Sequence, residues 1–200
     1  MGREFELKYR ATVEQIDAIR TFYGDFETIS METTYYDTLD RKLSQRRCTL
    51  RRRMENEISV CTFKCPHKDG GRGEWEVEAA DIEEGITKLC RAGADPELMQ
   101  IAAKGLVEVC GAQFTRLAAP LEVPGALVEL ALDQGVLLGG GKELPFAEVE
   151  VELKAGTDEA AIAFATELAA RFDLQTEAKS KFDAEQDKLY EMMSEYMEQT

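Results

Sequence analysis

The 200-residue chain has a single histidine, no long apolar run and no excess of positive charge. Because His67 is the only histidine in the sequence, a Ser-His triad and general acid–base catalysis by histidine are not expected. No apolar run approaches the ~20 residues of a transmembrane helix, and the N-terminus lacks the basic and apolar regions of a secretory signal. The net charge of −15 disfavours non-specific nucleic-acid binding. We therefore expect a cytoplasmic protein with neither a membrane nor a nucleic-acid partner.

The five cysteines are odd in number and irregularly spaced, which predicts reduced thiols rather than a disulfide framework. Cys61, Cys65 and His67 form a Cys-x3-Cys-x-His pattern, but a structural zinc site needs four ligands. No second Cys/His pair stands nearby, and both cysteines fall on the apolar face of a predicted strand. The pattern therefore does not indicate a zinc site.

Length and composition predict one globular domain. The chain is 44% hydrophobic and 32% charged, which is ordinary for a folded protein, and 200 residues suffice for one substantial core. We expect residues 1–200 to form a single domain with a polar, helical C-terminal tail at about 183–200.

The hydrophobic periodicity predicts an α+β fold with eight strands and few helices. The strands are expected at about 3–10, 33–38, 48–54, 57–66, 74–80, 106–118, 125–133 and 146–154. The helices are expected near 12–23, within a broken stretch at 81–105, and at 157–172. Many strands with few crossovers indicate an antiparallel sheet that is curled or closed into a barrel.

Most of these strands carry charge on one face and apolar side chains on the other. In the first strand Glu4, Glu6 and Lys8 alternate with apolar or aromatic residues. The same alternation places these side chains on the charged faces of later strands: Arg51 and Arg53; Thr62 and Lys64; Glu74, Glu76 and Glu78; Glu129 and Asp133; Glu148, Glu150 and Glu152. Taken singly, each face could simply be the solvated side of a sheet.

The distribution of charge between strands favours another interpretation. Acids dominate some strands and bases others, whereas a solvated face usually mixes both signs. A sheet closed with this face inward would gather carboxylates, the hard ligands that Mg²⁺ or Mn²⁺ prefers. It would also gather arginines and lysines suited to phosphate oxygens. These are the recurring parts of phosphoryl-transfer sites.

The motifs resemble those of the CYTH superfamily, the triphosphate tunnel metalloenzymes. "EFELKYR" is similar to the family's Glu-x-Glu-x-Lys signature and lies within the first ten residues. "YYDT", "LRRR", "TFK", Arg116, "ALDQG", "EVEVEL" and "KSKF" follow in family order. The resemblance covers nearly the whole chain and implies an eight-stranded antiparallel β-barrel, a charged tunnel flanked by helices.

The resemblance also implies roles for individual residues. Glu4, Glu6, Lys8 and Glu150 would be catalytic. The implied metal ligands, for Mg²⁺ or Mn²⁺, are Glu4, Glu6, Glu148 and Glu150, with Asp133 and Glu152 adjoining. The implied triphosphate-binding residues are Lys8, Arg51, Arg53, Lys64, Arg116 and Lys181. Glu74 is also placed in the tunnel, while Arg46, Arg47 and Arg52 are expected at the surface or entrance. Two departures from the family pattern are Ala118, where another base is common, and Leu39, where proline is common.

The pattern is most similar to the bacterial inorganic triphosphatases, which implies hydrolysis of triphosphate to pyrophosphate and phosphate. Class IV adenylyl cyclase and thiamine triphosphatase activities are the enzymatic alternatives, and the sequence shows no aromatic sandwich for a nucleobase. A triphosphate- or polyphosphate-binding module without turnover is the alternative outside catalysis, although a polyanion-binding module would not need so many carboxylates. The sequence leaves the oligomeric state open.

Overall fold

The computed structural model describes residues 5–66, 72–139 and 141–176. In chain order the elements are β1 (Glu6–Arg10), α1 (Val13–Tyr23), β2 (Glu27–Asp37), α2 (Lys42–Gln45), β3 (Thr49–Glu55), β4 (Ile58–Pro66), β5 (Arg72–Glu78), α3 (Ile82–Arg91), α4 (Glu97–Ala102), β6 (Val107–Val123), β7 (Ala126–Gly139), β8 (Lys142–Gly156), α5 (Asp158–Phe172) and β9 (Gln175–Thr176). The tail predicted at 183–200 lies outside the described residues.

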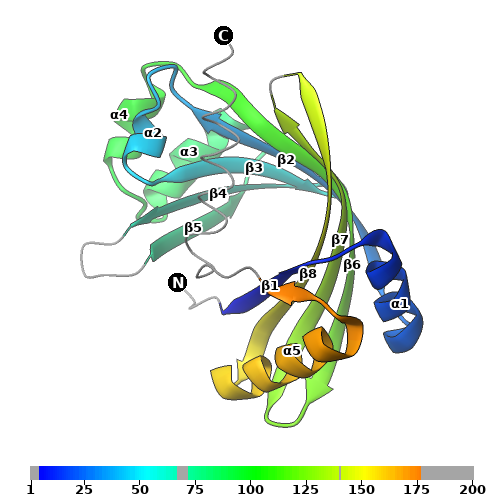
Figure 1. Cartoon of the computed structure of the whole chain (residues 1–200). Coiled ribbons are helices and arrows are strands. Elements are labelled where there is room, and N and C mark those ends of the chain that lie inside the picture. The colour runs from blue at the N-terminus through cyan, green and yellow to red at the C-terminus, as the bar shows by residue number, and fades with distance from the viewer. Residues whose placement is uncertain (1–4, 67–71, 140, 177–200) are drawn as a thin grey trace.

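The strands form one sheet in the order β5-β4-β3-β2-β6-β7-β8-β1-β9, and every pairing is antiparallel. The eight long strands confirm the predicted architecture, and β9 adds a two-residue strand beside β1. The sheet curls strongly into a half-barrel, with the helices outside the curl (Figure 1). Its concave face is therefore where the charged sides of the strands can meet.

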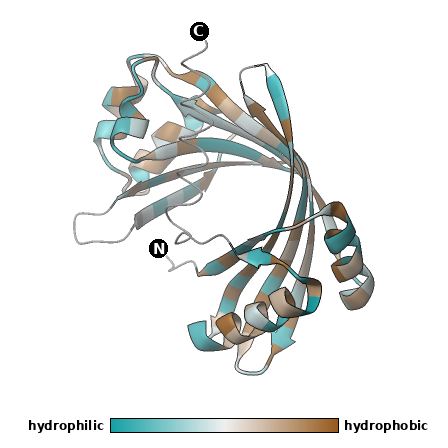
Figure 2. Ribbon diagram, in the orientation of Figure 1, coloured by the Kyte–Doolittle hydropathy of each residue, from teal (hydrophilic) through white to brown (hydrophobic). Residues whose placement is uncertain are grey.

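Two hydrophobic cores hold the helices against the convex face. Helices α2, α3 and α4 pack over β3–β5 around the fully buried Leu50, Leu89 and Leu98. Helices α1 and α5 pack over β1, β7 and β8 around residues such as Ile19 and Val149. Hydrophilic and hydrophobic residues alternate along the strands (Figure 2), so each strand can contribute one face to a core and the other to the concave side.

Three helices begin directly after a residue whose side chain caps the first turn. Thr12 caps α1 in a capping box with Gln15, Asp81 caps α3, and Thr157 caps α5. The described helices are all too short or too polar to cross a membrane.

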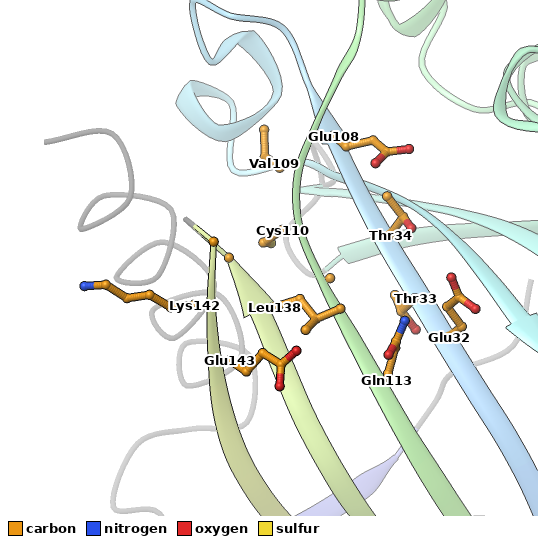
Figure 3. Close-up of a pocket in the computed structure, with 13 residues that line it drawn as sticks. Glu32, Thr33, Thr34, Glu108, Val109, Cys110, Gln113, Leu138, Lys142 and Glu143 are labelled. Atoms are coloured by element: carbon orange, nitrogen blue, oxygen red, sulfur yellow. The ribbon is translucent and has the colours of Figure 1, made fainter. Parts of the chain in front are cut away.

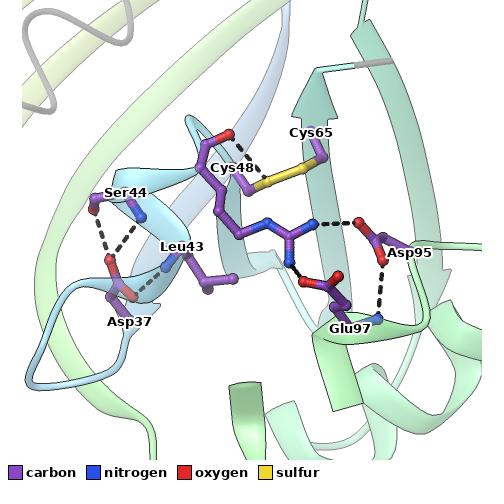
Figure 4. The surroundings of a disulfide bond; sticks show 8 residues. Asp37, Leu43, Ser44, Cys48, Cys65, Asp95 and Glu97 are labelled. Carbon is purple, nitrogen blue, oxygen red and sulfur yellow. Dashed lines mark hydrogen bonds and ion pairs between the residues drawn. A yellow bond between two sulfur atoms is a disulfide. The ribbon is translucent and has the colours of Figure 1, made fainter. Parts of the chain in front are cut away.

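The short helix α2, which was not predicted, is held by Asp37. This buried carboxylate accepts hydrogen bonds from the backbone N–H groups of Leu43 (2.9 Å) and Ser44 (3.0 Å), and from the Ser44 hydroxyl (2.6 Å), as Figure 4 shows. The aspartate of the "YYDT" motif therefore has a structural role in this chain, because it caps a helix that carries the chain from β2 to β3.

The cysteine prediction was wrong for one pair, because Cys48 and Cys65 form a disulfide (Figure 4). Thr49 pairs with Lys64 across the β3–β4 hairpin, so the neighbouring residues 48 and 65 lie directly opposite each other. Cys61, Cys90 and Cys110 are free thiols, and Cys61 is fully buried among apolar residues as expected. Burial raises the pKa of Cys61 to about 11, which keeps this thiol protonated at neutral pH.

Candidate active site

The concave face contains a cavity of about 130 Å³ to which six strands contribute side chains. Its charged lining residues are Lys8 of β1, Arg51 and Arg53 of β3, Arg116 of β6, Asp133 of β7, and Glu148 and Glu150 of β8. Residues of both signs that lie up to 142 positions apart in the chain (8 to 150) are therefore brought to one small space.

Arg116 is at the centre of this cluster. Its Nε and Nη2 atoms donate to the two carboxylate oxygens of Asp133 at 2.8 and 2.6 Å, and Nη2 also donates to Glu150 Oε2 at 2.6 Å. Arg116 and Asp133 are directly opposite on β6 and β7, so the sheet register itself creates the two-pronged contact. All three side chains are largely buried, with exposed fractions of 13%, 3% and 8% for Arg116, Asp133 and Glu150.

Lys8 completes the cluster from the opposite side of Glu150. Its Nζ atom is 2.7 Å from Glu150 Oε1 and 3.9 Å from Glu6 Oε1. Lys8 and Glu150 are register partners on β1 and β8. One carboxylate, that of Glu150, is therefore shared between an ammonium and a guanidinium group.

These contacts explain the shifted pKa values at the centre of the cavity. Burial alone lowers the pKa of Arg116, but its hydrogen bonds to Asp133 and the charges of Glu150 and Asp133 raise it well above the ordinary value. Burial raises the pKa of Asp133 to about 6, with a further rise from Glu150, against the lowering effect of Arg116. Arg116 thus favours the ionised form of the buried Asp133 carboxyl group.

The two arginines of β3 line another side of the cavity, next to Thr33 and Tyr35 of β2. Burial lowers the pKa of Arg53, and the positive charges of Arg51 and Arg116 lower it further. The Arg53 Nη1 atom is 3.4 Å from Glu55 Oε1, while its buried Nε atom has no hydrogen-bond partner among the described residues. Mutually repelling arginines in a partly buried space favour the binding of an anion.

Several predicted site residues lie away from the cavity or outside the described residues. Lys64 pairs with Glu74 at 3.1 Å on β4 and β5, and neither residue lines the cavity. Glu152 pairs with Lys154 at 2.8 Å near the surface. Arg52 is on the convex face and donates to the Ser59 hydroxyl at 2.8 Å, and Arg46 pairs with Asp95 and Glu97. Glu4 and Lys181 are not among the described residues, so their roles remain predictions.

Sequence reasoning missed an apolar part of the same cavity. Phe114, Phe146 and Leu137 line it beside the charged cluster, and the two phenylalanine rings pack edge to face with centroids 5.5 Å apart. The alternation along the strands could have found both rings. Phe114 precedes Arg116 by two residues and Phe146 precedes Glu148 by two, so each shares the face of a predicted site residue.

A second, wider pocket of about 460 Å³ adjoins the cavity and shares Thr33, Cys110 and Gly111 with it. Its rim carries Glu32, Glu108, Lys142 and Glu143, which come from β2, β6 and β8 (Figure 3). The two hollows therefore border the same stretch of β2 and β6.

The carboxylates of the concave face have the chemistry that Mg²⁺ or Mn²⁺ requires, since they supply only oxygen donors. Glu6 on β1 is directly opposite Glu152 on β8, which is itself opposite Glu129 on β7, so these three acids lie in a row across neighbouring strands. Asp133 and Glu148 form a second opposed pair on β7 and β8. Among residues 5–66, 72–139 and 141–176, however, no three His, Cys, Asp or Glu side chains converge on one point. Lys8 and Arg116 instead engage Glu150 and Asp133. The donor type fits a hard cation, although these carboxylates are not assembled around a common centre.

Comparisons with known proteins agree with this fold. A curated inorganic triphosphatase from Haemophilus influenzae is 28% identical over 160 residues, which cover 78% of this chain and 45% of that protein. The chain thus spans less than half the length of this relative. A candidate adenylate cyclase from Bacillus halodurans superimposes with a TM-score of 0.62 at 21% identity, covering 91% of this chain and 96% of the other.

A candidate adenylyl cyclase from Hippeastrum, described as having a dominant triphosphatase activity, superimposes with a TM-score of 0.64 at 17% identity. The match covers 90% of this chain and 93% of the other. At these identities the two structures establish the fold alone. The sequence model of the CYTH domain matches residues 2–184, nearly the whole chain, and the protein therefore belongs to the CYTH family.

Proposed function

We propose that this protein hydrolyses inorganic triphosphate to pyrophosphate and phosphate. The observation that carries the proposal is the small cavity in which Lys8, Arg51, Arg53 and Arg116 face Asp133, Glu148 and Glu150. Bases of this kind bind and neutralise phosphate oxygens, and nearby carboxylates can hold a divalent cation. The names of the relatives, which include an inorganic triphosphatase, support the same substrate class.

The basic residues would act directly on the substrate. Arg51, Arg53 and Arg116 would donate hydrogen bonds to non-bridging phosphoryl oxygens and stabilise charge on the leaving pyrophosphate. Lys8 would fix the end of the substrate nearest Glu150. Each of these groups would be positioned before substrate arrives, because each comes from a strand of the same rigid sheet.

A divalent cation would be held by Glu6, Glu148 and Glu150, together with the predicted Glu4. When bound, such an ion neutralises phosphate oxygens and favours ionisation of a bound water. Covalent catalysis is not needed and has no good candidate in the cavity. Cys110 lines it, but burial raises the pKa of this thiol to about 12, so the nucleophilic thiolate is scarce at neutral pH.

An organic triphosphate is the second candidate substrate, and Phe114, Phe146 and Leu137 favour it. These residues give the cavity an apolar wall on which a thiamine or nucleoside group could rest. Hydrolysis of thiamine triphosphate and cyclisation of ATP are therefore the alternatives to be tested beside the first proposal.

A side-by-side assay distinguishes these substrates. We expect kcat/KM for inorganic triphosphate to exceed that for ATP and thiamine triphosphate by at least about tenfold, because the charged groups satisfy phosphates without an organic part. Phosphate release is measured for each substrate with Mg²⁺ and with Mn²⁺, and products of ATP are separated chromatographically. Cyclic AMP as the main product from ATP, with negligible phosphate from triphosphate, would replace the first proposal by the cyclase.

Replacing Arg53 by methionine is expected to lower kcat/KM for triphosphate by about 100-fold, since a preorganised charge on phosphate is lost. Methionine keeps an unbranched stem of similar length, so packing changes little. Arg52→Met is the matched control, because the neighbouring Arg52 is on the convex face and bonds Ser59 instead. Steady-state kinetics of the two variants make the comparison, and equal activity would place Arg53 outside the substrate site.

A further inference from the structure

Thr33 is a buried polar residue that the roles proposed above leave unexplained. Its exposed fraction is 4%, yet its Oγ1 atom has no hydrogen-bond partner among the described residues. Buried hydroxyls are nearly always hydrogen-bonded, because desolvating one without a partner is unfavourable. An unsatisfied buried hydroxyl in a native structure therefore calls for an explanation, and a ligand that binds beside it is one.

The surroundings of Thr33 indicate which ligand would satisfy it. Thr33 is directly opposite Arg53 on β3 and opposite Ala112 on β6, and all three line the charged cavity. Ala112 offers no polar side chain. Arg53 offers only donors, and its buried Nε atom likewise has no partner among the described residues. The Thr33 hydroxyl and the Arg53 Nε–H group do not bond to each other, and an anion between them could accept a hydrogen bond from both.

We propose that Thr33 is a further substrate-binding residue, whose hydroxyl donates a hydrogen bond to a phosphoryl oxygen beside the one that Arg53 binds. This inference rests on the proposed triphosphate substrate. It assigns to β2 a direct part in recognition, next to the bases of β1, β3 and β6. Directly opposite side chains on paired strands are close enough to contact one phosphoryl group.

The test compares Thr33→Val, which replaces the hydroxyl by a methyl group of the same shape, with Thr33→Ser, which keeps it. Thr28→Val is the matched control, because Thr28 is an exposed threonine of the same strand and lines neither pocket. Three quantities are measured for each variant. Calorimetry gives the affinity for inorganic triphosphate without metal, steady-state kinetics give kcat and KM with Mg²⁺, and thermal unfolding gives the melting temperature without ligand.

Thr33→Val is expected to raise Kd for triphosphate by about tenfold. Thr33→Ser should stay within about threefold of wild type, and Thr28→Val should leave Kd unchanged. The ligand-free Thr33→Val protein should melt at the same or a higher temperature, because an unsatisfied buried hydroxyl has been removed. A residue with only a structural role would not give this combination of weaker binding and undiminished stability.

Two results would overturn the inference. Wild-type triphosphate affinity in Thr33→Val means that the hydroxyl does not contact the substrate. A lower melting temperature together with weak binding that Thr33→Ser fails to restore means that Thr33 acts through the fold. Wild-type protein that neither binds nor hydrolyses triphosphate refutes the proposed function itself, so the two failures are distinguishable.

Discussion

Replacing Glu150 by glutamine is expected to lower kcat for triphosphate hydrolysis by roughly 10³-fold while leaving the protein folded. Glu150 contacts both Lys8, at 2.7 Å, and Arg116, at 2.6 Å. It therefore lies where the cation-binding acids meet the phosphate-binding bases. A neutral amide cannot supply the charge for a divalent ion there, and its NH₂ group cannot accept from either base.

The same substitution should not weaken the binding of triphosphate without metal. Removing a negative charge from the cavity makes it more positive, so metal-free affinity is expected to stay equal or to rise by several-fold. Glu27→Gln, an exposed position at the start of β2, controls for the change of residue type. Turnover is measured at saturating Mg²⁺ and binding by calorimetry. Wild-type turnover in Glu150→Gln would show that the carboxylate has no part in the reaction.

Alternation along the strands predicted much of this site, because the side-chain period of a strand is fixed at two. It separated Arg51 and Arg53 from Arg52, and Glu148 and Glu150 from the buried Val149 between them. The resemblance to a family then selected which charged faces belonged to a tunnel. Neither argument included Thr33 or Phe114, since both considered only charged side chains.

Strand ends were the weakest part of the sequence prediction. Strands β6, β7 and β8 are 17, 14 and 15 residues long and extend well beyond the predicted ranges. Pro120, Gly135 and Pro145 resemble breaks, yet each is paired within the sheet. At Gly135 a Cβ atom would collide with the Gln113 carbonyl oxygen, so the glycine allows a close approach of two strands rather than ending one.

The spacing of the two cysteines around the β3–β4 hairpin is enough to predict the disulfide between Cys48 and Cys65. The strands predicted at 48–54 and 57–66 are separated by only two residues, which implies a tight hairpin, and Glu55 pairs with Ile58. Counting outward from that pair places Cys48 opposite Cys65. An odd cysteine count describes the whole chain, whereas register determines which two thiols can meet, and register is the stronger argument.

Replacing Arg116 by methionine is expected to lower the free energy of unfolding by about 3 kcal/mol at pH 8, because two buried carboxylates lose their common partner. Asp133 and Glu150 would then face each other without the guanidinium group between them, while Lys8 stays 2.7 Å from Glu150. Urea unfolding measures the loss. Arg171→Met is the control, since Arg171 pairs with Glu167 on the exposed side of α5. The decrease in the free energy of unfolding for this variant should be small and independent of pH.

The loss in Arg116→Met should depend on pH with a defined sign. The pKa of Asp133 is already raised to about 6 with Arg116 present, and removing the arginine raises it further. A carboxyl group whose pKa is higher in the folded state holds its proton more tightly there, so stability falls as pH rises from about 4 through the folded pKa. The free energy of unfolding of Arg116→Met should therefore be close to that of wild type near pH 4 to 5 and much lower at pH 8.

Adding Asp133→Asn to Arg116→Met should restore much of the stability at pH 8, because it removes one of the uncompensated charges. A deficit that is equal at both pH values, or one that the second substitution does not reduce, would show that Arg116 stabilises the sheet by packing and not by its charge.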